Sequence, residues 1–243
     1  MNEAVIPSST LTERLVTVIQ RLEASARMND RAPDEITLVA VSKTHPAAMV
    51  QAAVAAGLKN FGENRVQEAE MKIPLVGRSA AVWHLIGHLQ SNKARRAVKL
   101  FDVIHSVDSI ELATKLNRAC AEEGRTTLPI LIQADLAKEP TKSGVELDHV
   151  SELVDTIKRC DYLRLAGLMT LPPFFDDPEL TRPYFRQLCE LRDNLQAQGY
   201  FGADRGELSM GMTHDFEVAI SEGATMVRIG TAIFGERLQK QGN

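Results

Sequence analysis

The stretch Ile36-Thr-Leu-Val-Ala-Val-Ser-Lys-Thr-His-Pro46 decides between two ways of building an α/β fold from this sequence. Its first six residues, Ile36–Val41, form a short run rich in β-branched side chains, which is typical of a strand buried on both faces. An open, doubly wound sheet usually carries a glycine-rich turn directly after its first strand. Here that position holds Ser42–Pro46, which contains no glycine, so the stretch favours a closed barrel.

On the C-terminal side of this stretch the chain alternates between strand patterns and helix patterns. Further strands are predicted at Asn60–Gly62, Val82–Ile86, Asp102–His105, Leu128–Ala134, Leu163–Leu168, Glu207–Met210 and Met226–Ile229. Helices are predicted at 46–56, Val66–Ile73, 91–98, Ser109–Glu123, Leu147–Lys158, Pro178–Gln198 and Asp215–Glu222. Repeated βα units of this length predict parallel strands with right-handed crossovers, and eight of them predict closure into a barrel.

A helix is also predicted before the first strand, with Ser9 or Thr10 as its cap. Its apolar residues recur at helical spacing on one face, namely Leu11, Leu15, Val18, Ile19 and Leu22. No linker, low-complexity tract or internal repeat divides the 243 residues, a length at which barrels commonly form one domain. We therefore predict an α/β fold, a single (β/α)8 TIM-type barrel preceded by an N-terminal helix, with residues 1–243 as a single domain.

The composition argues against several classes of partner. A formal net charge of -4 argues against a nucleic-acid partner, and the one basic run, Lys93–Lys99, is predicted to be a solvated helix face. No stretch approaches the roughly 20 apolar residues of a membrane span, and residues 1–10 lack the pattern of a signal peptide. The three cysteines, Cys120, Cys160 and Cys189, are widely spaced, which fits a reducing cytosol and offers no zinc site. We expect a cytoplasmic protein that binds neither nucleic acid nor membrane.

Lys43 comes directly after the first predicted strand. In a barrel of this kind the functional side chains lie at the C-terminal ends of the strands, so Lys43 is expected at the barrel mouth. Partial burial there would favour the uncharged, nucleophilic form of its amine. A surface lysine at a strand end is the alternative interpretation, and the last two strands decide between them.

The segments at the end of the chain predict a phosphate site. Gly230 and Thr231 follow the last predicted strand, where unpaired N–H groups and a small hydroxyl residue suit an anion. Ser209, in the preceding strand, adds a second hydroxyl. The loops after the seventh and eighth strands form the usual phosphate site of such barrels. A lysine at the end of the first strand together with this phosphate site indicates a functional lysine more specifically than either feature alone.

Five motifs are spread along nearly the whole chain. They are Val41-Ser-Lys-Thr44, Phe61-Gly-Glu-Asn64 with Gln67-Glu68, Trp83-His-Leu-Ile-Gly-His-Leu-Gln-Ser-Asn-Lys93, Leu208-Ser-Met-Gly-Met212 and Val227-Arg-Ile-Gly-Thr-Ala-Ile-Phe-Gly235. In this order they resemble the motifs of the pyridoxal phosphate homeostasis protein family, whose barrel is similar to the N-terminal domain of alanine racemase. The resemblance implies that pyridoxal 5'-phosphate is the cofactor and that Lys43 holds it as a Schiff base. It also implies that Ser209, Gly230 and Thr231 hold the phosphate and that Arg228 faces the pyridine nitrogen.

Arg228 bears on whether such a site performs catalysis. Enzymes that use the pyridoxal ring as a strong electron sink usually pair its nitrogen with a carboxylate. An arginine stays charged and only donates, so it favours the unprotonated nitrogen, which stabilises a carbanion poorly. In alanine racemase-like enzymes a tyrosine from an additional β-domain completes the site. This chain ends at Asn243, so that domain is expected to be absent, and the chain's own tyrosines are predicted away from the mouth. We therefore expect no catalytic residue and no enzyme.

Other polar residues near the predicted mouth are weaker candidates. Asn64 and His84, at the ends of the second and third strands, are predicted to line the cofactor ring, and a core histidine is the alternative for His84. His84 and His88 do not share a helix face, so no metal site is expected. Thr170 is a candidate for the border of the pocket. Lys142 is a candidate for a second anion, with plain solvent exposure as the alternative.

The sequence thus predicts a pyridoxal 5'-phosphate-binding protein that serves intracellular homeostasis or carriage of the cofactor, with apo pyridoxal enzymes as recipients. The first alternative is a pyridoxal-dependent enzyme of the alanine racemase type that acts on an amino acid. A further alternative is a barrel enzyme for another phosphorylated metabolite, in which Lys43 acts on a sugar carbonyl. The expected absence of the additional racemase domain, which normally builds the dimer, favours a monomer.

Overall fold

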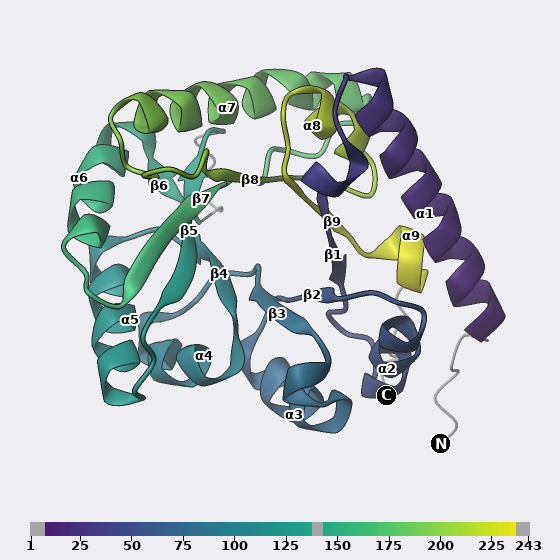
Figure 1. The fold of residues 1–243 in the computed structure, drawn as a ribbon, viewed down its shortest axis with the longest axis horizontal. Coiled ribbons are helices and arrows are strands. Elements are labelled where there is room, and N and C mark those ends of the chain that lie inside the picture. The colour runs from purple at the N-terminus through teal and green to yellow at the C-terminus, as the bar shows by residue number, and fades with distance from the viewer. Residues whose placement is uncertain (1–7, 138–142, 237–243) are drawn as a thin grey trace.

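The computed structural model describes residues 8–137 and 143–236 and has a ring of parallel strands enclosed by helices (Figure 1). The strands of the described residues are β1 (Thr37–Val41), β2 (Asn60–Glu63), β3 (Val82–Leu85), β4 (Val103–Val107), β5 (Leu128–Asp135), β6 (Val145–Glu146), β7 (Leu163–Met169), β8 (Glu207–Met212) and β9 (Met226–Ile229). They lie side by side in the order β4-β3-β2-β1-β9-β8-β7-β5, and the pairing of β4 with β5 closes the ring. The predicted (β/α)8 barrel is therefore confirmed.

One strand of the described residues stands outside this ring. β6 has two residues and pairs with β5 in a separate small sheet. Two residues are too few to show the alternation from which a strand is predicted, so the sequence did not reveal this element.

The helices of the described residues form the outer layer of the barrel (Figure 1). They are α1 (Ser8–Met28), α2 (Ala47–Ala55), α3 (Val66–Val76), α4 (Ala94–Leu100), α5 (Ile110–Glu122), α6 (Leu147–Lys158), α7 (Arg182–Ala197), α8 (Phe216–Ser221) and α9 (Thr231–Phe234). α1, the predicted N-terminal helix, packs against α8 and α9. Within the described ranges, no helix combines the length and the apolar character that a membrane crossing requires.

Two helix boundaries differ from the sequence prediction. Ser9 and Thr10 lie within α1, so the prediction that one of them caps this helix is wrong. The helix predicted at Pro178–Gln198 begins as a separate 3-10 turn, Pro178–Thr181, and α7 starts after it. Pro183 lies in the first turn of α7 and has no N–H group for a continuous helix, so a new helix begins there.

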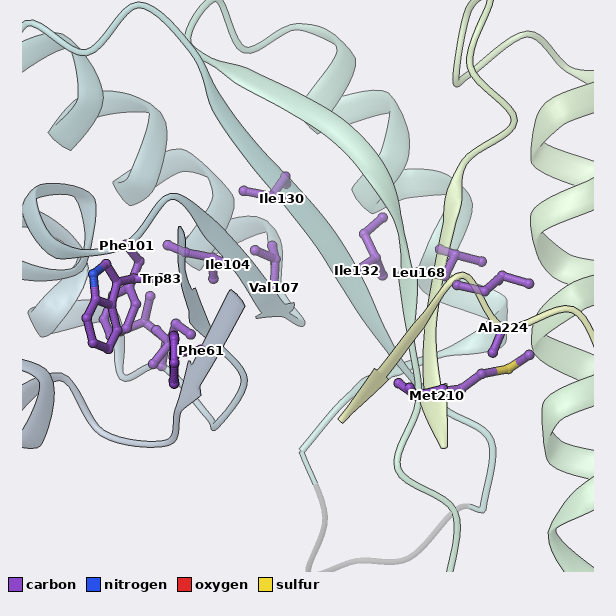
Figure 2. Close-up of a cluster of buried hydrophobic side chains, with 14 of the residues drawn as sticks. Phe61, Trp83, Phe101, Ile104, Val107, Ile130, Ile132, Leu168, Met210 and Ala224 are labelled. Atoms are coloured by element: carbon purple, nitrogen blue, oxygen red, sulfur yellow. The ribbon is translucent and has the colours of Figure 1, made fainter. Parts of the chain in front are cut away.

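Side chains alternate between the two faces of the barrel wall, as the two-residue period of a strand requires. Those that face outward form the hydrophobic core between strands and helices, and Figure 2 shows part of this core. Phe61 on β2 and Trp83 on β3 are buried there, with their ring centroids 5.7 Å apart. These outward side chains therefore hold the helices against the barrel. The alternate strand positions, which face inward, line its interior.

The inward positions carry several polar side chains. His84 follows the outward Trp83, His105 follows Ile104, and Ser209 precedes Met210. Arg228 likewise lies between two outward residues of β9. These four polar residues are buried, so they need hydrogen-bond partners inside the barrel.

Candidate functional site

A chain of hydrogen bonds crosses the barrel interior and joins three predicted site residues. Arg228 Nη1 on β9 donates to Ser209 Oγ on β8 at 2.6 Å, and that hydroxyl lies 2.9 Å from His105 Nδ1 on β4. His105 Nε2 lies 2.8 Å from His84 Nδ1 on β3, and His84 Nε2 lies 3.1 Å from Asn60 Oδ1. Because β4 and β8 are not neighbours in the ring, the contact between His105 and Ser209 spans the interior.

The groups at the two ends of this chain of hydrogen bonds determine which group donates and which accepts in each bond. Arg228 can only donate, and the amide oxygen of Asn60 can only accept. The Ser209 hydroxyl therefore accepts from Arg228 and donates to His105 Nδ1. His105 then donates from Nε2 to His84 Nδ1, and His84 donates from Nε2 to Asn60. Each histidine ring carries one proton in this arrangement and is neutral.

Burial favours the same neutral state. His84 is 2% exposed and His105 is 0% exposed. Burial lowers the pKa of His84 to about 4. Burial also lowers the pKa of His105 well below its ordinary value, and repulsion from the Arg228 cation, and from His84 if it were protonated, lowers it further. Burial also lowers the pKa of Arg228 to about 10, opposed by the negative charge of Asp215. Arg228 therefore remains a cation at neutral pH and gives the interior a fixed positive charge.

Lys43 is half-buried and follows β1 by two residues, at the C-terminal end of the barrel. Val41, the last residue of β1, is level with His84, because both pair with Gly62 in the strand register. The Ser42 side chain is directed to the outer face of the wall, where its hydroxyl is hydrogen-bonded. Lys43 itself lies in the turn that follows β1, at the same end of the barrel as these residues.

The start of α9 lies beside the strand that leads to Lys43. β9 pairs with β1, and a Cβ atom on Gly230 would lie 3.3 Å from the carbonyl oxygen of Val41. The ring of His45 lies 5.1 Å from that of Phe234 in α9. The short helix α9 therefore packs against the loop that carries Lys43, as the predicted combination of lysine and phosphate site requires.

The segments after β8 and β9 gather groups that can bind an anion. In α9 the N–H groups of Ile233 and Phe234 donate to the Gly230 carbonyl, and those of Thr231 and Ala232, at the start of the helix, have no acceptor within it. The exposed Thr231 hydroxyl lies 3.2 Å from the hydroxyl of Thr213, which follows β8. Gly230 keeps the approach free of a side chain. Ser209 lies elsewhere: it is fully buried, and its hydroxyl is engaged by Arg228 and His105.

The weaker candidates lie around this centre. Thr170 follows β7 and is buried, and its carbonyl oxygen accepts from Arg228 Nη2 at 2.8 Å. Asn64 lines a cavity of about 690 Å³ between the loops after β2 and β3, together with Arg65 and Lys93. No group of three or more His, Cys, Asp or Glu side chains within residues 8–137 and 143–236 is arranged to hold a metal ion. The structure thus joins Thr170 to the interior chain and places Asn64 in a neighbouring cavity.

Some polar residues near the site carried no prediction. His105 could have been found from the sequence, because a histidine inside a buried, apolar strand needs a partner. Thr213 gave no signal apart from its place after a strand. Lys72 and Glu63, which pair behind the loop of Lys43, look in the sequence like an ordinary helix residue and a strand end. Lys142 lies outside the described residues.

Comparison with known proteins assigns the chain to a family. A family model described as the N-terminal domain of alanine racemase matches residues 20–238. Fold and site thus define a barrel of the alanine racemase N-terminal type. The pyridoxal phosphate homeostasis protein of Aquifex aeolicus is 41% identical over 225 residues, covering 93% of this chain and 97% of the relative. The protein of the same name from Escherichia coli (strain K12) is 41% identical over 232 residues, with the same coverage. The chain belongs to the pyridoxal phosphate homeostasis protein family.

Solved structures agree with this assignment. PipY of Synechococcus elongatus, solved without pyridoxal phosphate, is 40% identical with a TM-score of 0.82 and covers 93% of this chain and 100% of its own. PipY with pyridoxal phosphate bound is 38% identical with a TM-score of 0.80 and the same coverage. The names of the curated relatives describe homeostasis of a cofactor and no reaction. At the level of the family, this agrees with the expectation of a protein that is not an enzyme.

Proposed function

We propose that this chain binds pyridoxal 5'-phosphate as a Schiff base on Lys43 and serves the homeostasis or carriage of the cofactor. The observation that carries the proposal is the packing of α9 against the loop of Lys43, so that Lys43 and the start of α9 lie at the same end of the barrel. The relatives named for pyridoxal phosphate homeostasis and the pyridoxal phosphate-bound PipY structure support it.

The donors around Lys43 fit the groups of the cofactor. Its phosphate is matched by the N–H groups at Gly230 and Thr231, and its pyridine nitrogen by the Arg228 guanidinium. Bound in this way, pyridoxal phosphate supplies a reactive aldehyde, which only an amine at the correct distance can capture. Asn64 and His84 border the ring in this proposal, and Ser209 reaches the phosphate by releasing one of its present partners.

The proposed role is holding the cofactor rather than catalysis. Arg228 offers donors and a positive charge, which oppose protonation of the pyridine nitrogen. We propose that residues 1–243 act as a single domain and a monomer in the cytoplasm, and that apo pyridoxal enzymes receive the cofactor from it. Transfer of labelled cofactor from the purified protein to an apo-enzyme, faster than from free solution, is the expected result.

The central test is the visible absorbance of the purified protein with pyridoxal phosphate, before and after reduction with borohydride. We expect the absorbance of a protonated Schiff base and a reduced adduct that peptide mapping assigns to Lys43. Lys43→Ala is expected to abolish both signals, while the control Lys115→Ala, on the exposed face of α5, keeps them. A retained absorbance in Lys43→Ala, or a label on another lysine, refutes the assignment.

The match to the alanine racemase N-terminal domain favours one alternative, a pyridoxal-dependent enzyme that acts on an amino acid. The two functions differ in α-proton exchange. Incubation of the loaded protein with a panel of amino acids in deuterated water should give exchange no faster than free pyridoxal phosphate. A rate well above that of the free cofactor would establish the enzyme and overturn the carrier.

A further inference from the structure

A buried ion pair lies behind the loop that carries Lys43, on the outer face of the barrel wall. Lys72 of α3 is 5% exposed and Glu63 at the end of β2 is 0% exposed, and Lys72 Nζ lies 2.6 Å from Glu63 Oε1. The same ammonium group donates to Glu68 Oε1 at 2.8 Å and to the Ser42 carbonyl oxygen at 2.7 Å. An ammonium has three donors, and here each of them has a partner.

The hydrogen bonds of this cluster reach the main chain on both sides of Lys43. Before it, the carbonyl of Ser42 accepts from Lys72. After it, the N–H group of Thr44 donates to Glu68 Oε1 at 2.5 Å. Since Glu68 and Lys72 are themselves paired, the two flanking peptide groups are fixed to one unit on α3. The main chain of Lys43 is therefore held from both directions.

Thr44 shows why this segment needs to be held. Its φ angle is 67°, in the left-handed region that a β-branched residue rarely adopts. Such a conformation costs free energy and persists only where the surroundings impose it. The bond from the Thr44 N–H to Glu68 is a direct restraint on this residue. The loop after β1 thus has a strained residue next to Lys43, and the N–H group of that residue has an acceptor on α3.

The cluster is poorly explained as a device for stability alone. Burial raises the pKa of Glu63, and the contacts with Lys72 and Ser42 oppose that rise. The second carboxylate oxygen of Glu63 is buried without a hydrogen-bond partner in the described part of the chain. Buried ion pairs can often be replaced by apolar side chains without loss of stability. An apolar pair, however, cannot bind the main-chain groups next to Lys43.

We propose that Glu63, Glu68 and Lys72 are positioning residues for Lys43: they fix its main chain so that its amine stands where it can bond the aldehyde of the cofactor. This inference rests on the proposed function and adds to it a structural cause for the choice of this lysine. None of the three residues needs to touch the cofactor. Their loss should therefore impair the covalent bond and leave the phosphate and ring contacts intact.

Glu68→Ala is the variant of choice, because it removes the acceptor of the Thr44 N–H and leaves the buried pair of Lys72 and Glu63 in place. We expect the affinity for pyridoxal phosphate to fall about tenfold or more. The affinity for pyridoxamine 5'-phosphate, which has no aldehyde, should change by less than about twofold. In the cofactor-free protein, hydrogen exchange at the Thr44 amide should accelerate. Glu68→Gln keeps an acceptor oxygen and should restore most of the pyridoxal phosphate affinity.

Glu111→Ala is the matched control, since Glu111 also pairs with a lysine four residues later on a helix, but on an exposed face. It should leave both affinities unchanged. The double variant Glu63→Gln with Lys72→Met removes the bond from Lys72 to the Ser42 carbonyl and leaves no charge at either of these two buried positions, and it should show the same selective loss. The folding of the double variant is checked by urea titration. If the double variant does not fold, the result for Glu68→Ala alone tests the positioning role.

Equal losses for the two ligands, or no loss for pyridoxal phosphate in Glu68→Ala, would overturn the positioning role. Failure of the proposed function looks different. In that case the unaltered protein gives no borohydride-stable label on Lys43, whichever variant is compared with it.

Discussion

The two histidines buried in the barrel should make the stability of the protein depend on pH below neutrality. Burial lowers the pKa of His84 from 6.5 to about 4, whereas the unfolded chain binds its proton at the ordinary value. The stability is therefore fully present above about pH 6.5 and is lost as the pH falls toward 4. At about 1.4 kcal/mol per pKa unit, the difference between 6.5 and about 4 corresponds to about 3 kcal/mol. His105 changes stability in the same direction.

The assay is the free energy of unfolding from urea titrations between about pH 7 and pH 4, for the unaltered protein and for His84→Gln. Glutamine does not titrate, so the difference in stability between the two proteins should shift by about 3 kcal/mol over this window, in favour of the variant at low pH. His149→Gln, which replaces an exposed histidine of α6, is the control for the substitution itself. A parallel pH dependence of the unaltered protein and His84→Gln, or an NMR titration of His84 near pH 6.5, would refute the reasoning.

Three further substitutions test separate parts of the structure. In Gly167→Ala the new Cβ would lie 2.1 Å from the carbonyl oxygen of Glu207, so β7 and β8 must separate. The free energy of unfolding should therefore fall by about 1–3 kcal/mol, and an unchanged urea midpoint would contradict this. Thr231→Val removes a proposed phosphate donor, so the affinities for pyridoxal phosphate and for pyridoxamine 5'-phosphate should both fall by about threefold to tenfold in a binding titration. A lower affinity for one ligand alone would contradict the assignment. Arg228→Glu should weaken cofactor binding by at least about tenfold or shift the visible absorbance, and unchanged values of both would exclude contact with the ring.

The strands were the most predictable part of the fold, because each is a short apolar run between helix patterns. β9 has the predicted bounds Met226–Ile229, and the other barrel strands differ by one or two residues at one or both ends. The two-residue β6 and the 3-10 turn Pro178–Thr181 were not predicted, since both depend on local hydrogen bonds that leave little hydrophobic pattern. Periodicity reports the buried face of an element and says little about where its last hydrogen bond lies.

Candidate site residues could be chosen from the sequence only where a residue of suitable chemistry follows a predicted strand. Lys43 and Gly230 follow strands, and their positions suggested an amine and a phosphate site. The partners of the buried residues were not predictable, because they depend on which strands meet across the interior. His105 and Ser209 are 104 residues apart in sequence and in contact only because the barrel closes. Lys72 and Ser42 are 30 residues apart and meet for a similar reason.

The two polar networks lie on opposite faces of the barrel wall, and both act on geometry and charge rather than on proton transfer. Inside, every ring nitrogen of His84 and His105 has a hydrogen-bond partner, and burial keeps both rings neutral at neutral pH. A general base must take up a proton near the working pH, so these histidines are poorly suited to that work. Outside, the bonds of Lys72 and Glu68 end on the main chain beside Lys43. Both networks hold geometry and charge in place, and this supports the proposal that the protein captures a cofactor rather than using it for catalysis.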